Sequence, residues 1–187
     1  VAFPTETVYG LGGNGLNKEA SKKIYAAKGR PSDNPLILHI ADMEQFYPLI
    51  KTDNEKIIAR AEALADVFWP GPLTMILPKA DNIPYETTGG LDTVAIRMPS
   101  HLVARALLQE CKMPIAAPSA NLSGRPSPTS ASHVIEDMNG RIEMIIDGGD
   151  VGIGVESTII DLTGEVPMLL RPGFVTPEML KDVLGAI

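Results

Sequence analysis

Short apolar runs alternate with amphipathic stretches along the whole of this chain. The apolar runs are bounded by proline, glycine or polar residues and predict short strands, at residues 1–3, 36–40, 73–77, 93–98, 115–117, 144–146, 158–162 and 168–170. Apolar residues at helical spacing behind a capping side chain predict helices, which we expect to begin at Asn17, Asp42 with Gln45, Thr52 with Glu55, Ser100, Ser130 or Thr129, and Thr176. Because the late strands follow one another without helices between them, the pattern predicts an α/β (α+β) fold with a mixed sheet flanked by helices.

Composition narrows the class of protein. A chain of 187 residues, 44% of them hydrophobic, can bury one good core, so we expect a single domain over residues 1–187. Because the chain opens on Val1 in the middle of a predicted strand, we expect it to be a piece of a longer protein. No apolar run approaches the ~18 residues of a membrane span, so we expect no membrane association and a cytoplasmic location.

Charge and cysteine content bound the chemistry further. The formal net charge of −7 disfavours a general nucleic-acid-binding surface. The single cysteine, Cys111, excludes an internal disulfide, and its apolar helical surroundings predict a buried thiol. With three scattered histidines and no second thiol, the sequence predicts no metal centre. His101 and His133 fall on predicted helices, where we expect structural or surface roles.

The stretch at residues 28–36 (KGRPSDNPL) joins the first long predicted helix to the following strand. Gly29 suits a helix end that needs a positive φ, and the two prolines keep the loop out of helical conformation. Lys28 and Arg30 would then sit on a rigid loop, where a point charge and a planar fork of donors can bind phosphate. The alternative is that Lys28 only complements the dipole of the preceding helix.

A glycine-rich run at residues 10–15 matches G-x-G-x-x-G, the pattern of dinucleotide-binding proteins. That function needs an acidic residue at the end of the next strand, about 20 positions on. Asp42 comes too late and resembles a helix cap. We therefore favour a turn that lets the backbone approach a ligand or another strand, and a nicotinamide oxidoreductase remains an alternative.

A second polar pair, Ser119 and Asn121, ends a short apolar strand within residues 114–128 (PIAAPSANLSGRPSP). Taken alone, the pair fits a turn that caps the strand as well as it fits a ligand contact. Together with residues 4–12 (PTETVYGLG), however, the chain resembles the YrdC/Sua5 family, the L-threonylcarbamoyladenylate synthases. The mark of that family is a K-x-R pair and a distant S-x-N pair in one cavity. Similar blocks recur at 69–74 (WPGPLT), 94–99 (VAIRMP), 155–160 (VESTII) and 170–173 (LRPG), so the resemblance covers essentially the whole chain.

The resemblance implies a YrdC/RibB-like fold, a strongly twisted sheet around a concave cavity, and a reaction without a protein nucleophile. L-Threonine, bicarbonate and ATP would give L-threonylcarbamoyladenylate and pyrophosphate, which supply N6-threonylcarbamoyladenosine at position 37 of tRNA. Mg²⁺ would arrive with ATP, held by phosphates and water, and no protein metal site is expected. The implied partners are the machinery that transfers the group to tRNA and, weakly, tRNA itself. A longer type in the family adds a C-terminal domain.

The family pattern also implies the site residues. The catalytic positions would be Lys28, Arg30, Ser119 and Asn121. The ATP contacts would be Lys28, Arg30, Asn34, Thr93, Ser119, Ser127 and Arg171. Threonine would be bound by Thr7, His39, Arg97, the backbone near Ala117, and Ser157. From the residues alone, Arg97 can pair bidentately with a carboxylate, whereas Arg171 fits a surface ion pair and His39 a core histidine.

Two further alternatives stay open besides the oxidoreductase. One is the related domain of hydrogenase-maturing carbamoyltransferases, which makes a carbamoyl adenylate from carbamoyl phosphate. It normally sits in a longer chain with zinc-finger cysteines, which are absent here. The other is a non-catalytic RNA-binding module, which the acidic balance disfavours.

Overall fold

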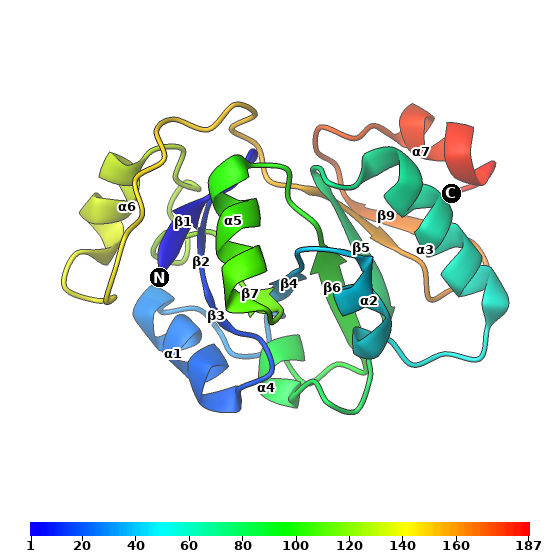
Figure 1. Ribbon diagram of the computed structural model, residues 1–187, viewed down its shortest axis with the longest axis horizontal. Helices are drawn as coiled ribbons and strands as arrows, with labels where there is room; N and C mark the ends of the chain where they lie inside the picture. The colour runs from blue at the N-terminus through cyan, green and yellow to red at the C-terminus, as the bar shows by residue number, and fades with distance from the viewer.

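The structure, a computed structural model, describes residues 1–187 and is organised around a seven-stranded mixed sheet (Figure 1). The strand order is β3-β7-β4-β6-β5-β8-β9. The strands are β3 Gly13–Asn14, β4 Ile37–His39, β5 Leu73–Pro78, β6 Thr93–Arg97, β7 Ile115–Ala116, β8 Thr158–Asp161 and β9 Met168–Arg171. The pairs β4–β6 and β5–β8 are parallel and the others antiparallel. The predicted mixed sheet is thus confirmed.

A separate antiparallel pair, β1 Ala2–Pro4 and β2 Tyr9–Leu11, lies beside this sheet. The helices are α1 Lys18–Lys28, α2 Met43–Phe46, the 3₁₀ turn Tyr47–Leu49, α3 Glu55–Phe68, α4 Tyr85–Thr88, α5 Leu102–Cys111, α6 Ala131–Met138 and α7 Pro177–Leu184. Figure 1 places α6 at one end of the molecule, and α3 with α7 at the other end beside the C terminus. None of these helices combines the length and apolarity needed to cross a membrane.

The period-2 alternation of the strands gives the sheet two different faces. Met75 of β5 and Ile96 of β6 are fully buried in the main core, which also contains Leu64 of α3. Their neighbours Ile76 and Ala95 point to the opposite face and line a cavity. One face therefore carries packed helices, and the other is left for a binding site.

The local signals around α1 are confirmed. Asn17 caps the helix by accepting hydrogen bonds from the backbone of Glu19 and Ala20, and Gly29 ends it with φ +62°. Gly15, at the end of the glycine-rich run, has no room for a side chain, because a Cβ there would lie 2.2 Å from Leu38. The run is not the turn that the sequence favours, because it includes Gly10 of β2 and Gly13 of β3, but its glycines do allow close approach to neighbouring strands.

Three expected boundaries are wrong. Residues 144–146 form no strand, because Ile145 makes only one bridge to Ala2, whose strand stops at Pro4, a residue without an N–H to continue the ladder. The cap of α5 is His101, whose Nδ1 accepts from Val103 N at 3.1 Å, rather than Ser100. The cap of α3 is Asn54 rather than Thr52, which only accepts from Asn54 N.

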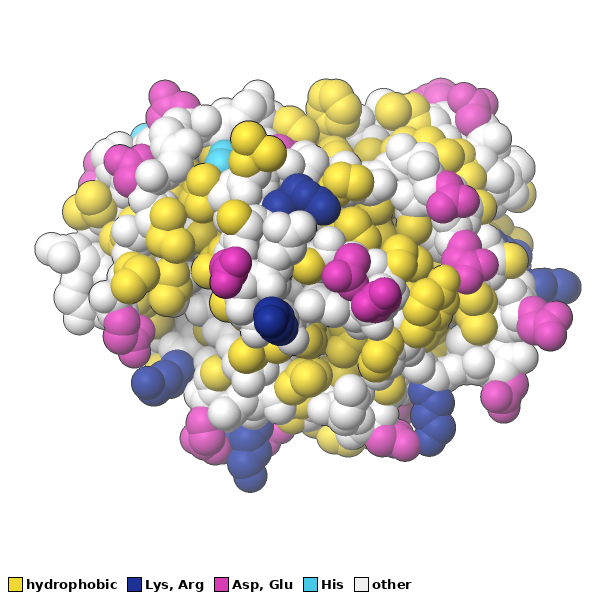
Figure 2. Space-filling model, viewed as in Figure 1, with side chains coloured by type: hydrophobic (Ala, Val, Ile, Leu, Met, Phe, Trp, Pro, Cys, Tyr) yellow, Lys and Arg dark blue, Asp and Glu magenta, His cyan; other side chains and the backbone are white.

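Other expectations are confirmed or corrected in detail. Ser130 and Thr176 cap α6 and α7, and Asp42 caps α2. Cys111 is only partly buried, because it lies in the last turn of α5 at the edge of a small cluster. Figure 2 shows lysine and arginine side chains spread singly over the viewed face among acidic ones. No basic patch gathers on this face.

Candidate active site

A cavity of about 170 Å³ lies on the open face of the sheet, between the residues 5–10 segment, the loop after α1, and β4, β6 and β8. Nine of the predicted site residues line it: Thr7, Arg30, Asn34, His39, Arg97, Ala117, Ser119, Ser157 and Arg171. Four others, Lys28, Thr93, Asn121 and Ser127, are not on its wall. Segments far apart in the sequence thus converge on one cavity.

Arg97 forms one end of the cavity and is held in place before any ligand arrives. Its side chain is 4% exposed, its Nη2 pairs with Glu6 Oε1 at 2.6 Å, and its Nη1 donates to Thr7 Oγ1 at 2.9 Å. Burial alone would raise the pKa of Glu6, but the charge and hydrogen bond of Arg97, with the backbone N–H of Ser100, lower it overall. Each terminal nitrogen of Arg97 keeps one further N–H, so the guanidinium can also hold a ligand carboxylate.

His39 lies beside Arg97 and is buried as a neutral imidazole. Burial, followed by the positive charge of Arg97, lowers the pKa of His39 to about 3. Its Nδ1 lies 3.2 Å from the carbonyl oxygen of Ile37. His39 therefore offers a neutral polar wall and no positive charge. Ser157, which pairs with Thr74 Oγ1 at 2.7 Å, adds a buried hydroxyl nearby.

Arg30 lies at the other end of the cavity and is braced by its own loop. Its Nη2 donates to Asn34 Oδ1 at 2.8 Å and to Pro35 O at 2.9 Å, while its Nε donates to Asn34 O at 3.2 Å. Nη1 makes no hydrogen bond within the protein. Asn34 thus orients the guanidinium, which keeps donors for an anion.

Arg171 is held to Glu156 and Ser157. Its Nη1 pairs with Glu156 Oε2 at 2.6 Å, its Nε donates to Ser157 O at 2.9 Å, and its Nη2 donates to Ser157 Oγ at 3.1 Å. Ser127 reaches the same group, because its hydroxyl donates to Glu156 Oε1 at 2.9 Å. Arg171 thus forms the ion pair expected from its residues alone and also lines the cavity.

Lys28 does not line the cavity; it is buried against the loop that carries Ser119. It is 2% exposed, and its Nζ donates to Ser119 O at 2.5 Å, Asn121 O at 2.6 Å and Asn121 Oδ1 at 3.3 Å. These contacts use every N–H of the ammonium. Burial, together with the nearby charge of Arg30, lowers the pKa of Lys28 to about 8, so the ammonium form predominates at pH 7. The K-x-R and S-x-N pairs do meet, and Lys28 joins them.

Sequence reasoning missed Glu6 and Glu156, the two carboxylates of this site. Glu6 lies in the 4–12 block and Glu156 beside Ser157 in the 155–160 block, so the quoted blocks contained them without a role. Thr93 begins β6 on the same face as Ala95 and Arg97, but beyond the cavity wall.

No group of three or more His, Cys, Asp or Glu side chains could hold a metal ion. The cavity wall carries one carboxylate, Glu156.

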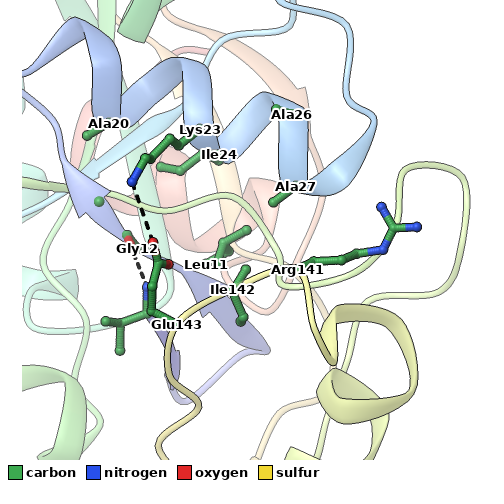
Figure 3. Close-up of a pocket in the computed structure, with 12 residues that line it drawn as sticks. Leu11, Gly12, Ala20, Lys23, Ile24, Ala26, Ala27, Arg141, Ile142 and Glu143 are labelled. Carbon is green, nitrogen blue, oxygen red and sulfur yellow. Dashed lines mark hydrogen bonds and ion pairs between the residues drawn. The ribbon is translucent and has the colours of Figure 1, made fainter.

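A larger cavity, of about 510 Å³, lies elsewhere, between β2, α1 and the chain near Ile142 (Figure 3). Two of its charged side chains, Lys23 and Glu143, pair with each other at 3.5 Å. In Figure 3 Arg141 points away from the other labelled residues. The other residues of its wall are mostly apolar, so polar side chains do not converge in this cavity as they do in the first.

The fold and cavity define a class: a mixed α/β protein with a cavity lined by three arginines, Arg30, Arg97 and Arg171, on the open face of its sheet. A family model for Sua5, YciO and YrdC, described as Telomere recombination, matches residues 1–173. The chain therefore belongs to the Sua5/YciO/YrdC family.

Two curated relatives carry the name threonylcarbamoyl-AMP synthase. The protein from Pyrococcus abyssi is 60% identical over all of this chain and 54% of its own length. That from Bacillus subtilis is 58% identical over all of this chain and 53% of its own length. The solved structure of P. abyssi Sua5 complexed with L-threonine superposes with a TM-score of 0.95 at 60% identity, covering the whole chain and 54% of that protein. The chain spans about half the length of these relatives.

Proposed function

We propose that this chain carries the catalytic site of an L-threonylcarbamoyladenylate synthase. The observation that carries the proposal is one cavity with an arginine near each end of β4: Arg97 lies beside His39 at the end of the strand, and Arg30 bonds Pro35 before its start. Arg171 lines the same cavity and is in register with Arg97 across β5 and β8. A reaction that joins an amino acid to a nucleotide needs both ends. The names of the two curated relatives favour threonine as the amino acid.

The end at Arg97 would bind threonine. Its free N–H groups would hold the carboxylate, while Thr7, neutral His39 and Ser157 surround the hydroxyl and methyl. The P. abyssi relative was solved in complex with L-threonine, which supports threonine as the amino acid. The enclosed volume of about 170 Å³ lies below the ~300–1,000 Å³ of sites that bury drug-sized ligands. It therefore suits the amino acid and the reacting phosphate, with the nucleoside over the rim.

The end at Arg30 would bind the triphosphate. Arg30 and Arg171 present donors to the phosphates, and Asn34, Ser119 and Ser127 add polar contacts around them. Lys28 would act by holding the loop of Ser119 and Asn121 against the end of α1. Mg²⁺ would come with ATP, bound mainly by phosphates and water.

The reaction needs no protein nucleophile. The threonine amine attacks the carbon of bicarbonate and water leaves, which gives a carbamate. A carbamate oxygen then attacks the α-phosphorus of ATP, and the bond to the β-phosphate oxygen breaks as pyrophosphate departs. The protein positions the two substrates and stabilises negative charge on the phosphates through Arg30 and Arg171.

The wider setting belongs to the same proposal. The product would pass to machinery that modifies tRNA in the cytoplasm, and any contact of this chain with tRNA would be weak. The scattered cations of Figure 2 and the net charge of −7 support a small-molecule enzyme over an RNA-binding module.

The bicarbonate step is tested by isotope incorporation. The chain is incubated with ATP, Mg²⁺, L-threonine and ¹³C-bicarbonate, and the product is analysed by mass spectrometry. We expect an adenylate that contains both threonine and the ¹³C label. In a second incubation, carbamoyl phosphate replaces threonine and bicarbonate, and an adenylate formed there would support the carbamoyltransferase alternative. A threonyl adenylate without the label in the first incubation would exclude the carbamate step.

A further inference from the structure

Glu156 is the one carboxylate on the wall of the cavity, and it stands among the groups assigned to phosphate. Its side chain is 36% exposed, and its two oxygens contact Arg171 and Ser127. A carboxylate at this place repels a free triphosphate. Under the proposed function, on which this inference rests, the negative charge needs an explanation.

A role in orienting Arg171 does not explain the negative charge of Glu156 at this place. Arg171 is already fixed by Ser157, whose carbonyl oxygen accepts from Nε at 2.9 Å and whose hydroxyl accepts from Nη2 at 3.1 Å. These contacts hold the plane of the guanidinium without Glu156. A purely orienting carboxylate would therefore add repulsion toward ATP with little gain in geometry.

The carboxylate has capacity left for a cation. Each oxygen of Glu156 accepts one contact in the protein, from Arg171 or from Ser127, and an ionised carboxylate oxygen has a further lone pair. Mg²⁺ in nucleotide sites is usually bound by only one or two protein carboxylates, together with phosphate oxygens and water.

We propose that Glu156 supplies the protein oxygen ligand to the divalent cation carried by ATP, and so makes the cavity selective for metal-bound ATP over free ATP. Arg30 and Arg171 attract both forms of the nucleotide. Glu156 disfavours the free form by like-charge repulsion and favours the metal-bound form by coordination. Ser127 holds the carboxylate in place for this role.

Calorimetric titration of Glu156→Gln with ATP in Mg²⁺, and with ATP in EDTA, tests the inference without turnover, because threonine is omitted. We expect affinity for Mg²⁺-ATP to fall at least about tenfold, the size of effect seen when a metal site loses a supporting contact. Affinity for metal-free ATP should stay the same or rise, because the repelling charge is gone. Glu143→Gln is the matched control, since it removes one negative charge from an exposed ion pair elsewhere and should change neither affinity.

A second readout follows the metal itself. Free Mn²⁺ is measured by electron paramagnetic resonance while Mn²⁺ is titrated into ATP with the wild-type chain, with Glu156→Gln or with no protein. The wild-type chain should bind Mn²⁺ more tightly than ATP alone does, and Glu156→Gln should remove that difference. Glu156→Asp, which keeps the charge, should retain part of it.

The other outcomes overturn the inference. Equal weakening of both nucleotide forms in Glu156→Gln would mean that Glu156 only orients Arg171. Equally tighter binding of both nucleotide forms would mean that Glu156 only offsets the positive charge of the arginines. If ATP binds and the adenylate forms while Glu156→Gln shows no metal-dependent change, this inference alone fails. If the wild-type chain binds neither form of ATP, the proposed function fails with it.

Discussion

Lys28 and Asn121 are 93 residues apart in the sequence, yet Nζ of the lysine donates to both the carbonyl and the side-chain oxygen of the asparagine, at 2.6 and 3.3 Å. This contact fastens the loop after β7 to the end of α1. Arg30 projects from one side of the junction and Ser119 from the other, and both line the cavity. The two sequence pairs therefore form one structural unit, in which the lysine is buried and the arginine faces the cavity.

Replacing Lys28 should reduce stability as well as activity. Lys28→Met keeps the apolar stem but leaves three buried oxygens without their donor. An unsatisfied buried polar group costs about 1–3 kcal/mol, so we expect a loss in at least that range. Urea unfolding measures it. Unchanged unfolding together with lost ATP binding would instead mean that Lys28 contacts the nucleotide directly.

Replacing Arg30 should reduce activity alone. Arg30→Ala removes a preorganised charge from the phosphate end, and the loss of such a contact lowers turnover by about a hundredfold. The melting temperature should stay close to that of the wild-type chain, because the guanidinium contacts only its own loop. Arg141→Ala is the control, since Arg141 lies at the other cavity. Near-normal turnover of Arg30→Ala would refute the assignment.

Arg97→Lys should separate the two substrates. A lysine ammonium cannot keep the contacts to Glu6 and Thr7 and also offer a bidentate fork to a carboxylate. We expect threonine affinity to fall by about tenfold or more, corresponding to roughly 1.4 kcal/mol, with ATP affinity nearly unchanged. Separate calorimetric titrations decide this. Equal losses for both ligands would make Arg97 a structural residue or a nucleotide contact.

His39 should make the fold sensitive to acid. Its pKa is about 3 in the folded protein and about 6.5 when unfolded, so the unfolded chain binds more protons between these values. The contribution of His39 to stability is therefore complete above about pH 6.5 and declines as the pH falls toward 3. His39→Gln should show a shallower loss of stability over that range in urea unfolding. A slope identical to the wild type would contradict a buried neutral His39.

The same property bears on threonine binding. Because His39 stays neutral from pH 6 to 8, threonine affinity should not follow a titration with a midpoint near 6.5. Calorimetry at several pH values checks this, and such a midpoint would show that the imidazole is charged in the site.

Serine should replace threonine poorly. It lacks the methyl group that the pocket around His39 and Ser157 would contact, and one methyl in a snug site is worth about 1–3 kcal/mol. We expect roughly a 5- to 150-fold lower kcat/KM with serine. Equal rates for the two amino acids would place the methyl outside the pocket.

The sequence predicted the convergence of distant segments because short motifs bring recognisable side chains with them. The family resemblance carried by these motifs predicts Arg30, Arg97 and Ser119 in one cavity, and all three line it. The hydrogen bonds of Lys28 could not be predicted from the sequence, because its partners are mainly backbone oxygens, which carry no sequence signature. Glu156 carries no sequence signature of its own, because its contacts are to Arg171 and Ser127, which lie 15 and 29 residues away.

For the fold, too, some features could be predicted from the sequence and others could not. Strands with apolar alternation were predicted within one or two residues, whereas residues 144–146 form no strand because the partner strand ends at Pro4, which has no N–H to continue the ladder. The helix α4, Tyr85–Thr88, was not predicted, since four residues hold too little periodicity to be recognised. The observed helix caps lie one or two residues from the predicted ones, where neighbouring polar side chains could each have capped the helix.

The central claim is tested most directly by pyrophosphate release from Mg²⁺-ATP, with L-threonine and bicarbonate omitted in turn. The account predicts release only when both are present, and about a hundredfold less from Arg30→Ala under the same conditions. Release that does not depend on threonine, or release driven by carbamoyl phosphate alone, would contradict it.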